Sequence, residues 1–274
     1  MGFSFPKSQI KEWSYTLGTS LMAGLFAYLL LHLLTELSIL YFSYDLNIQA
    51  VLQVKGIRFL TSPGNPDWTR DATVTLYLVK PILNLLVAIA TMILYAVIRY
   101  KSQSFSFFMI WIIIFGLNNM FGTFLENGFL KNGIYKVVEV MHLGTIPFVL
   151  MLGLSFYFLY ISGVGTGKVI MLCLPGRHKS GRGIQFLYFF VAFLLPWIII
   201  LGLIFPFSDF DLKITYLFGI LLLIPFLWSR GPEKEGIHLD SLPAFLWNDL
   251  ISVIFFGIGI ILMIEMLSMN IRFH

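Results

Sequence analysis

About seven long apolar runs follow one another along the chain, separated by short polar segments. Most of these runs exceed the roughly 20 residues that a helix needs to cross a bilayer about 30 Å thick, so we predict spanning helices and not barrel strands. The shortest run makes six helices the alternative to seven. The predicted spans cover residues 14–42, 73–98, 105–125, 140–161, 187–207, 214–228 and 245–269.

The segment between the first two apolar runs has a different pattern. Residues 48–59 partly alternate between apolar and polar side chains and include several β-branched residues, and the turn-forming residues 62–67 follow them. Alternation bounded by proline, glycine and asparagine is typical of a β-hairpin. We therefore predict a short β-hairpin-like loop after the first helix, lying against the membrane.

Composition assigns the chain to a class. It contains 58% hydrophobic and 12% charged residues, with a mean hydropathy of +0.86, against roughly 45–50% and about 25% in soluble domains. The sequence therefore predicts an all-α polytopic membrane protein with one transmembrane domain over residues 1–274, made of a core over 14–130 and further helices over 131–274. We expect it in a bacterial inner membrane.

Charge and cysteine content limit the partners. The net charge of +4 is spread over short loops without a basic stripe for nucleic acid, and it suits anionic lipid headgroups. The expected partners are the lipid bilayer and other membrane protein subunits. Cys173 is the single cysteine, which excludes an internal disulfide and any cysteine-based metal site.

His32 and Glu36 lie within an otherwise uncharged apolar run. Their spacing of four residues places both side chains on one face of a helix. A polar pair inside lipid usually faces the interior of a bundle. Three interpretations remain open: a hydrogen bond that packs helices, half of a metal site made of imidazole and carboxylate, or a pair that handles protons or ions.

The next predicted helices carry further polar residues at their expected interior. In the second helix, Pro81 and Asn84 suit a kink whose freed carbonyl is satisfied by an amide. In the third, Asn119 suits an interhelical hydrogen bond, and Asn127 with Gly128 suits a helix end. The polar core predicted from the sequence consists of Pro81, Asn84, Asn119, Glu126 and His142.

The order of these features resembles the three-helix core of the site-2 protease family, the membrane-embedded zinc metalloproteases, over about residues 20–130. That family has HExxH on its first core helix, a loop with β-strands, a GPxxN-like motif on the second helix, and an Asn-rich stretch leading to Asp-Gly on the third. In this chain His32 and Glu36 match the two histidines of HExxH. Pro81 and Asn84 match the second motif, with Lys80 at the glycine position.

The third helix extends the resemblance. Asn119 matches its Asn-rich stretch, and Asn127 stands in place of the liganding aspartate. The resemblance thus implies His32, Glu36 and Asn127 as a weak or vestigial set of ligands for a divalent metal such as zinc, and the expected state is without a cofactor.

The departures from the motif bear on activity. Leu33 occupies the position of the glutamate, which in HExxH removes a proton from the metal-bound water. The resemblance therefore implies a protein that has lost peptide hydrolysis and that binds or scaffolds a partner membrane protein. Two alternatives remain: a subunit of a larger membrane transport or secretion complex with a proton- or ion-handling His-Glu pair, and an active intramembrane metalloenzyme with altered ligands.

Overall fold

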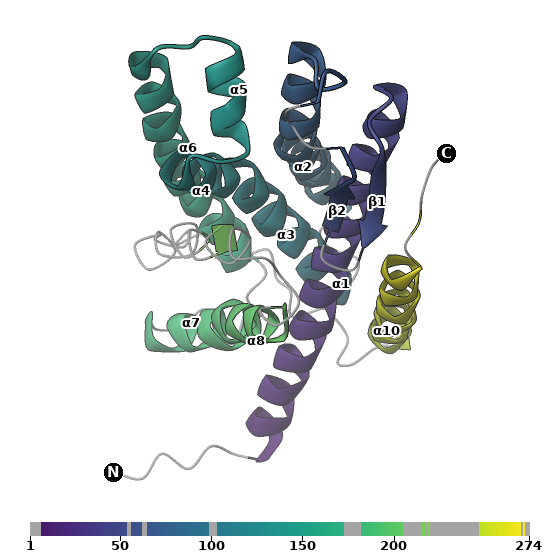
Figure 1. Ribbon diagram of the computed structural model, residues 1–274. Helices are drawn as coiled ribbons and strands as arrows, with labels where there is room; N and C mark the ends of the chain where they lie inside the picture. The colour runs from purple at the N-terminus through teal and green to yellow at the C-terminus, as the bar shows by residue number, and fades with distance from the viewer. Residues whose placement is uncertain are drawn as a thin grey trace.

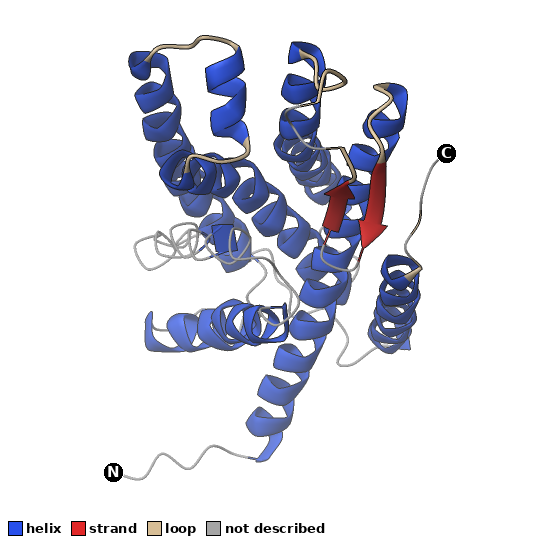
Figure 2. Cartoon of the chain, in the orientation of Figure 1, coloured by secondary structure: helices blue, strands red, loops and turns tan. Residues whose placement is uncertain are grey.

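The structure is a computed structural model that describes residues 7–53, 56–61, 65–98, 103–172, 182–204, 215–216, 219, 247–269 and 271. It is a bundle of helices with one two-stranded sheet (Figure 2). Six helical stretches in the described residues are long and apolar enough to cross a membrane: Trp13–Asp45, Arg70–Val97, Gln103–Leu130, Thr145–Lys168, Gln185–Leu203 and Ile251–Ser268. The predicted class of polytopic helical membrane protein is confirmed. The predicted span over 214–228 lies almost entirely outside the described residues.

The elements follow the order expected from the apolar runs (Figure 1). The first half of the chain forms α1 (Lys7–Asp45), β1 (Ala50–Gln53), β2 (Gly56–Phe59), α2 (Arg70–Ile98), α3 (Gln103–Leu117), a π-helical turn (Asn118–Gly122) and α4 (Thr123–Leu130). The second half forms α5 (Ile134–Val140), α6 (Thr145–Leu172), α7 (Arg182–Phe189), a second π-helical turn (Phe190–Leu194), α8 (Leu195–Ile204) and α10 (Trp247–Ser268).

Helix α1 is the centre of the bundle, and it packs on α2, α3, α8 and α10. A small residue, Gly24, permits a close approach of α1 to α3 and α8. A Cβ added there would lie 2.7 Å from Cδ1 of Ile200 and 3.0 Å from the Trp111 ring. The Trp111 indole N–H also donates a hydrogen bond of 2.9 Å to Oγ of Ser20. Small and hydroxyl residues that allow close packing and interhelical hydrogen bonds are the usual basis of helix association in lipid.

The predicted hairpin is present and lies alongside α1, with α10 next to β1 (Figure 1). Its strands are antiparallel, with Val51 opposite Arg58 and Leu52 opposite Ile57. Residues of β1 are buried, whereas β2 is more exposed. The hairpin therefore lies with its first strand toward the helical core.

The third span runs through Asn127 and Gly128, where the sequence predicted a helix end. Helix α4 continues to Leu130, and Lys131 ends it in a left-handed conformation with φ of 53°. The Asn127 amide donates to the Thr123 carbonyl 2.7 Å away inside the helix, so its side chain supports the helix. The insertion of one π-helical turn at Asn118–Gly122 was not predicted.

Two further boundaries differ from the prediction. The expected fourth span over 140–161 starts at the last residue of α5 and a turn, and α6 begins only at Thr145 and extends to Leu172. The first part of the expected basic loop, residues 163–172, is therefore helical. Apolar side chains such as those of Ile146 and Tyr157 keep α6 compatible with lipid, being 76% and 57% exposed. Glycines at 163, 165 and 167 made this stretch resemble a loop in the sequence, but bilayer burial overrides weak helix propensity.

Candidate functional site

Glu36 is a buried ionisable residue of α1 and forms the centre of the candidate site. Its side chain is 5% exposed, on the side of α1 that faces the hairpin. The backbone N–H of Ile57 on β2 donates a hydrogen bond of 2.8 Å to Glu36 Oε2. The carboxylate thus takes the place that a neighbouring strand would occupy at the edge of β2. Removing a carboxylate from water costs several kcal/mol unless its oxygens find such partners.

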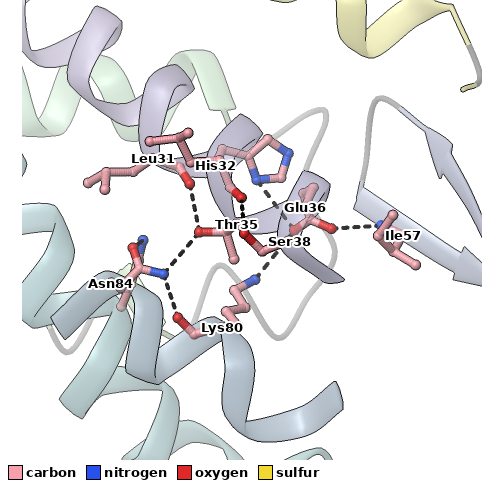
Figure 3. A network of polar contacts seen from close by, with 10 residues as sticks. Leu31, His32, Thr35, Glu36, Ser38, Ile57, Lys80 and Asn84 are labelled. Carbon is pink, nitrogen blue, oxygen red and sulfur yellow. Dashed lines mark hydrogen bonds and ion pairs between the residues drawn. The ribbon is translucent and has the colours of Figure 1, made fainter. Parts of the chain in front are cut away.

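The second oxygen of Glu36 lies close to two nitrogen groups (Figure 3). Lys80 Nζ from α2 is 3.8 Å away from Oε1, and His32 Nδ1 on α1 is 3.7 Å away from it. The Lys80 side chain is one-quarter exposed, and its ammonium compensates the buried charge of Glu36. The sequence showed Lys80 only as the residue at the glycine position of the second motif; the structure turns its side chain toward Glu36.

The ring of His32 is held by an aromatic neighbour one turn earlier. Tyr28 stacks on His32 with ring centroids 5.9 Å apart and planes 5° apart. Tyr28 also contacts Tyr216 edge-on, with ring centroids 5.6 Å apart. The imidazole is therefore fixed between Tyr28 and Glu36. This contact links α1 to the short described piece at residues 215–216.

Thr35, Asn84 and Asn119 join the first three spanning helices in one row of hydrogen bonds. The Asn84 amide nitrogen donates to Thr35 Oγ1 at 3.1 Å and to the Lys80 carbonyl at 2.8 Å. The Asn84 Oδ1 accepts from the amide of Asn119 at 3.1 Å. Thr35 donates in turn to the Leu31 carbonyl at 2.6 Å. Both donors of Asn84 and its acceptor are engaged, as a buried amide requires.

Glu126 and Asn127 form a second polar cluster on α4. The Asn127 amide donates to Glu126 Oε2 at 2.6 Å, and Thr215 Oγ1 lies 3.3 Å from the same oxygen. Asn127 Oδ1 accepts the backbone N–H of Ile134 at 3.0 Å, which satisfies the start of α5. The described partners of this second cluster therefore lie on α4, α5 and residues 215–216. The described partners of Glu36 lie on α1, α2 and the hairpin, so the two clusters are separate.

The other two residues expected in the polar core lie apart from these clusters. Pro81 is buried inside α2, next to Lys80. His142 differs from the expectation, because it is exposed in the turn between α5 and α6. It has a left-handed backbone conformation with φ of 52°, and its N–H donates to the Glu139 carbonyl at 3.0 Å. A turn at the end of a short helix places this side chain outside the bundle.

The residues expected as metal ligands do not fit a zinc ion as they are arranged. A structural or catalytic zinc site needs at least three protein ligands. His32 and Glu36 supply two, whereas Asn127 belongs to the second cluster. The Lys80 ammonium stands near the same carboxylate oxygen that a metal would need and repels a cation. Within the described residues no group of three or more His, Cys, Asp or Glu side chains is arranged to hold a metal ion.

Three members of the site escaped sequence reasoning. The Ile57 N–H carries no side-chain signal, and Thr35 reads as one of many hydroxyl residues in an apolar helix. Tyr216 lies in a short apolar run whose aromatic residues are expected to face lipid. Gly56 was the sequence clue to the contact between the hairpin and Glu36, because its φ of 124° suits glycine and a Cβ there would lie 3.3 Å from Glu36 Oε2.

Comparison of the chain with protein-family models, with curated proteins and with solved structures finds no match.

Proposed function

We propose that this chain is a non-catalytic integral membrane protein, resembling the site-2 protease core, that binds or scaffolds a partner membrane protein. The membrane that we propose for it is a bacterial inner membrane. The observation that carries the proposal is the internal compensation of Glu36: the Lys80 ammonium and the His32 imidazole lie 3.8 and 3.7 Å from one oxygen, and the Ile57 N–H binds the other.

This arrangement suits a structural role better than hydrolysis. A hydrolytic zinc site needs an open position for water and a base beside it. Here Leu33, at the position of that base in the resemblance, is an apolar side chain that is 7% exposed. Glu36 instead fastens the hairpin to α1 and α2. The site therefore holds the sheet in a fixed position against the spanning helices.

A fixed hairpin beside membrane helices is a means of binding extended segments. Strand addition uses backbone groups at a sheet edge for affinity and side-chain pockets for specificity. The exposed side chains of Arg58 and Leu60, the latter 52% exposed, border the hairpin on its second strand. We propose that the partner contacts this region, while the apolar faces of α2 and α6 contact lipid.

In-cell photo-crosslinking tests the proposal. A photoreactive amino acid is placed at Leu60, and a matched control at Val97, which is 77% exposed on α2. Crosslinked material from the native membrane is identified by mass spectrometry, in the wild-type background and with Glu36→Gln. We expect one membrane protein of full length crosslinked through Leu60, weaker capture with Glu36→Gln, and only lipid or diffuse products through Val97.

Two results contradict the proposal. Recovery of shortened partner fragments that disappear with His32→Ala and Glu36→Gln demonstrates cleavage and supports the altered metalloenzyme. Equal, diffuse crosslinking from Leu60 and Val97 shows that the hairpin has no specific partner.

A second candidate is a subunit of a larger membrane complex in which His32 and Glu36 handle protons or ions. The observation that favours it is the close contact of an imidazole with a buried carboxylate inside a spanning helix, a common feature of proton pathways. Proton flux measured in liposomes, compared between wild type and His32→Gln, distinguishes it: flux that depends on His32 supports this candidate.

A further inference from the structure

Asn118, Gly122 and Glu126 form a buried polar stripe on the third spanning stretch. They follow one another at intervals of four residues through the π-helical turn and α4, so they lie close to one face of the helix. Asn118 is completely buried and Glu126 is 3% exposed. Ionisable and polar side chains buried within a spanning helix commonly mark an ion site or an ion pathway.

Thr215 lies against the middle of this polar stripe. The position that a Cβ would take at Gly122 is 3.1 Å from the Thr215 carbonyl oxygen and 3.0 Å from Asn118 Oδ1. One helical turn further, the Thr215 hydroxyl donates to Glu126 Oε2 at 3.3 Å, which leaves the lone pairs of the hydroxyl for another group. Amide, carbonyl, hydroxyl and carboxylate oxygens therefore gather along the side of the helix where Gly122 has no side chain.

The Asn118 amide is the part of this arrangement that calls for a ligand. Within the described residues, neither Oδ1 nor Nδ2 of Asn118 has a hydrogen-bond partner. The next residue differs, because the Asn119 amide donates to Asn84 at 3.1 Å. A buried amide without partners is costly and rare. A ligand that Oδ1 binds beside Gly122 offsets part of this cost.

We infer that the polar stripe and Thr215 form a binding site for a small alkali-metal cation, Na⁺. Hard cations prefer oxygen ligands, and membrane proteins coordinate Na⁺ with carbonyl oxygens where a spanning helix departs from regular geometry. The π-helical turn at Asn118–Gly122 is such a departure. A single carboxylate, that of Glu126, matches a single positive charge. The site is separate from Glu36, whose charge Lys80 compensates, and it goes beyond the proposed function because it involves no partner protein.

Binding of radiolabelled Na⁺ to the full-length protein in detergent tests the site. We expect saturable binding that unlabelled Na⁺ displaces and choline does not. Asn118→Leu removes one ligand and Gly122→Ala fills the space between the oxygens, so each is expected to lower the Na⁺ affinity about tenfold or more. Asn119→Leu is the matched control, because the same change one residue later affects the bond to Asn84 and is expected to leave Na⁺ binding intact.

Thermal unfolding gives a second measurement on the same proteins. The wild type is expected to melt at a higher temperature in sodium chloride than in choline chloride of equal concentration, because a ligand of the folded state stabilises it. Asn118→Leu is expected to lose this difference. In choline chloride this variant is expected to be at least as stable as the wild type, because leucine removes a buried amide that has no partner.

Three results overturn the inference. The first is the absence of saturable Na⁺ binding by the folded wild type. The second is equal Na⁺ affinity, or an equal rise of the melting temperature in sodium chloride, for wild type and Asn118→Leu. The third is a loss of binding in folded Asn119→Leu as large as that in Asn118→Leu, because the effect is then not specific to the polar stripe. None of these results depends on the crosslinking experiment.

Discussion

The ammonium of Lys80 and the carboxylate of Glu36 lie 3.8 Å apart between two spanning helices. The charge of Glu36 is therefore compensated by a residue of the chain itself. Since the same carboxylate also binds the hairpin, this pair couples α1, α2 and the sheet.

A double-mutant cycle measures that coupling. Lys80→Met keeps the side-chain length and leaves the buried carboxylate without its cation, so we expect it to destabilise the fold by about 2–3 kcal/mol, below the full value for a buried pair because Lys80 is partly exposed. Lys80→Met combined with Glu36→Gln is expected to be more stable than Lys80→Met alone. Unfolding in mixed detergent micelles gives the free energies. Additive effects of the two substitutions contradict the pairing.

Asn84 is the central residue of the row of hydrogen bonds that joins the first three spanning helices. Its loss leaves Thr35 and Asn119 without this partner. We expect Asn84→Leu to lower stability by about 1–2 kcal/mol, since each interhelical hydrogen bond in lipid contributes roughly 0.6 kcal/mol and at most about 1.7. Leu86→Ala is the matched control, because Leu86 lies in the same helix and is 58% exposed. A larger loss from the control than from Asn84→Leu contradicts the role of the row.

The glycines on either side of α5 make a matched pair of substitutions. A Cβ at Gly133 would overlap Asn127 Oδ1, and the φ of Gly133 is 45°, whereas a Cβ at Gly144 meets nothing within 4 Å. We expect Gly133→Ala to destabilise by more than about 1 kcal/mol and Gly144→Ala to have little effect. Thermal unfolding in detergent compares them. Equal melting temperatures of the two variants argue against the bond between Asn127 and the start of α5.

A substitution at Gly56 tests the contact between the hairpin and Glu36 of α1. Alanine at this position is strained by the φ of 124° and brings its Cβ to 3.3 Å from Glu36 Oε2. We expect Gly56→Ala to accelerate amide exchange at Ile57 by severalfold, because the carboxylate must move away from its donor. Exchange at Ile57 that matches the wild-type rate would show that Glu36 does not hold the strand.

The fold was largely predictable because apolar run length determines spanning helices and the alternation over 48–59 marks a hairpin. The direction in which polar side chains point was harder to predict. His32 and Glu36 share a face by spacing alone, but the direction of Lys80 depends on how α2 packs against α1, which periodicity does not contain. The helix end expected at Asn127 failed for a related reason, since the amide bonds within its own helix and to the next one.

Backbone partners were beyond sequence reasoning altogether. The Ile57 N–H contributes to the site through geometry that any residue type provides. The π-helical turn at Asn118–Gly122 likewise has no pattern that separates it from an ordinary helix. Such turns arise where packing shifts one residue out of register, and they are frequent at functional positions.

Metal content tests the central claim most directly, because the claim is that Lys80 and not a metal ion compensates Glu36. Elemental analysis of the detergent-purified protein is made on wild type beside His32→Ala and Glu36→Ala, with folding checked by circular dichroism. We predict no stoichiometric zinc, iron or other transition metal in the folded wild type. A stoichiometric metal that is lost in both variants would contradict the account and would support a metalloenzyme with an altered set of ligands.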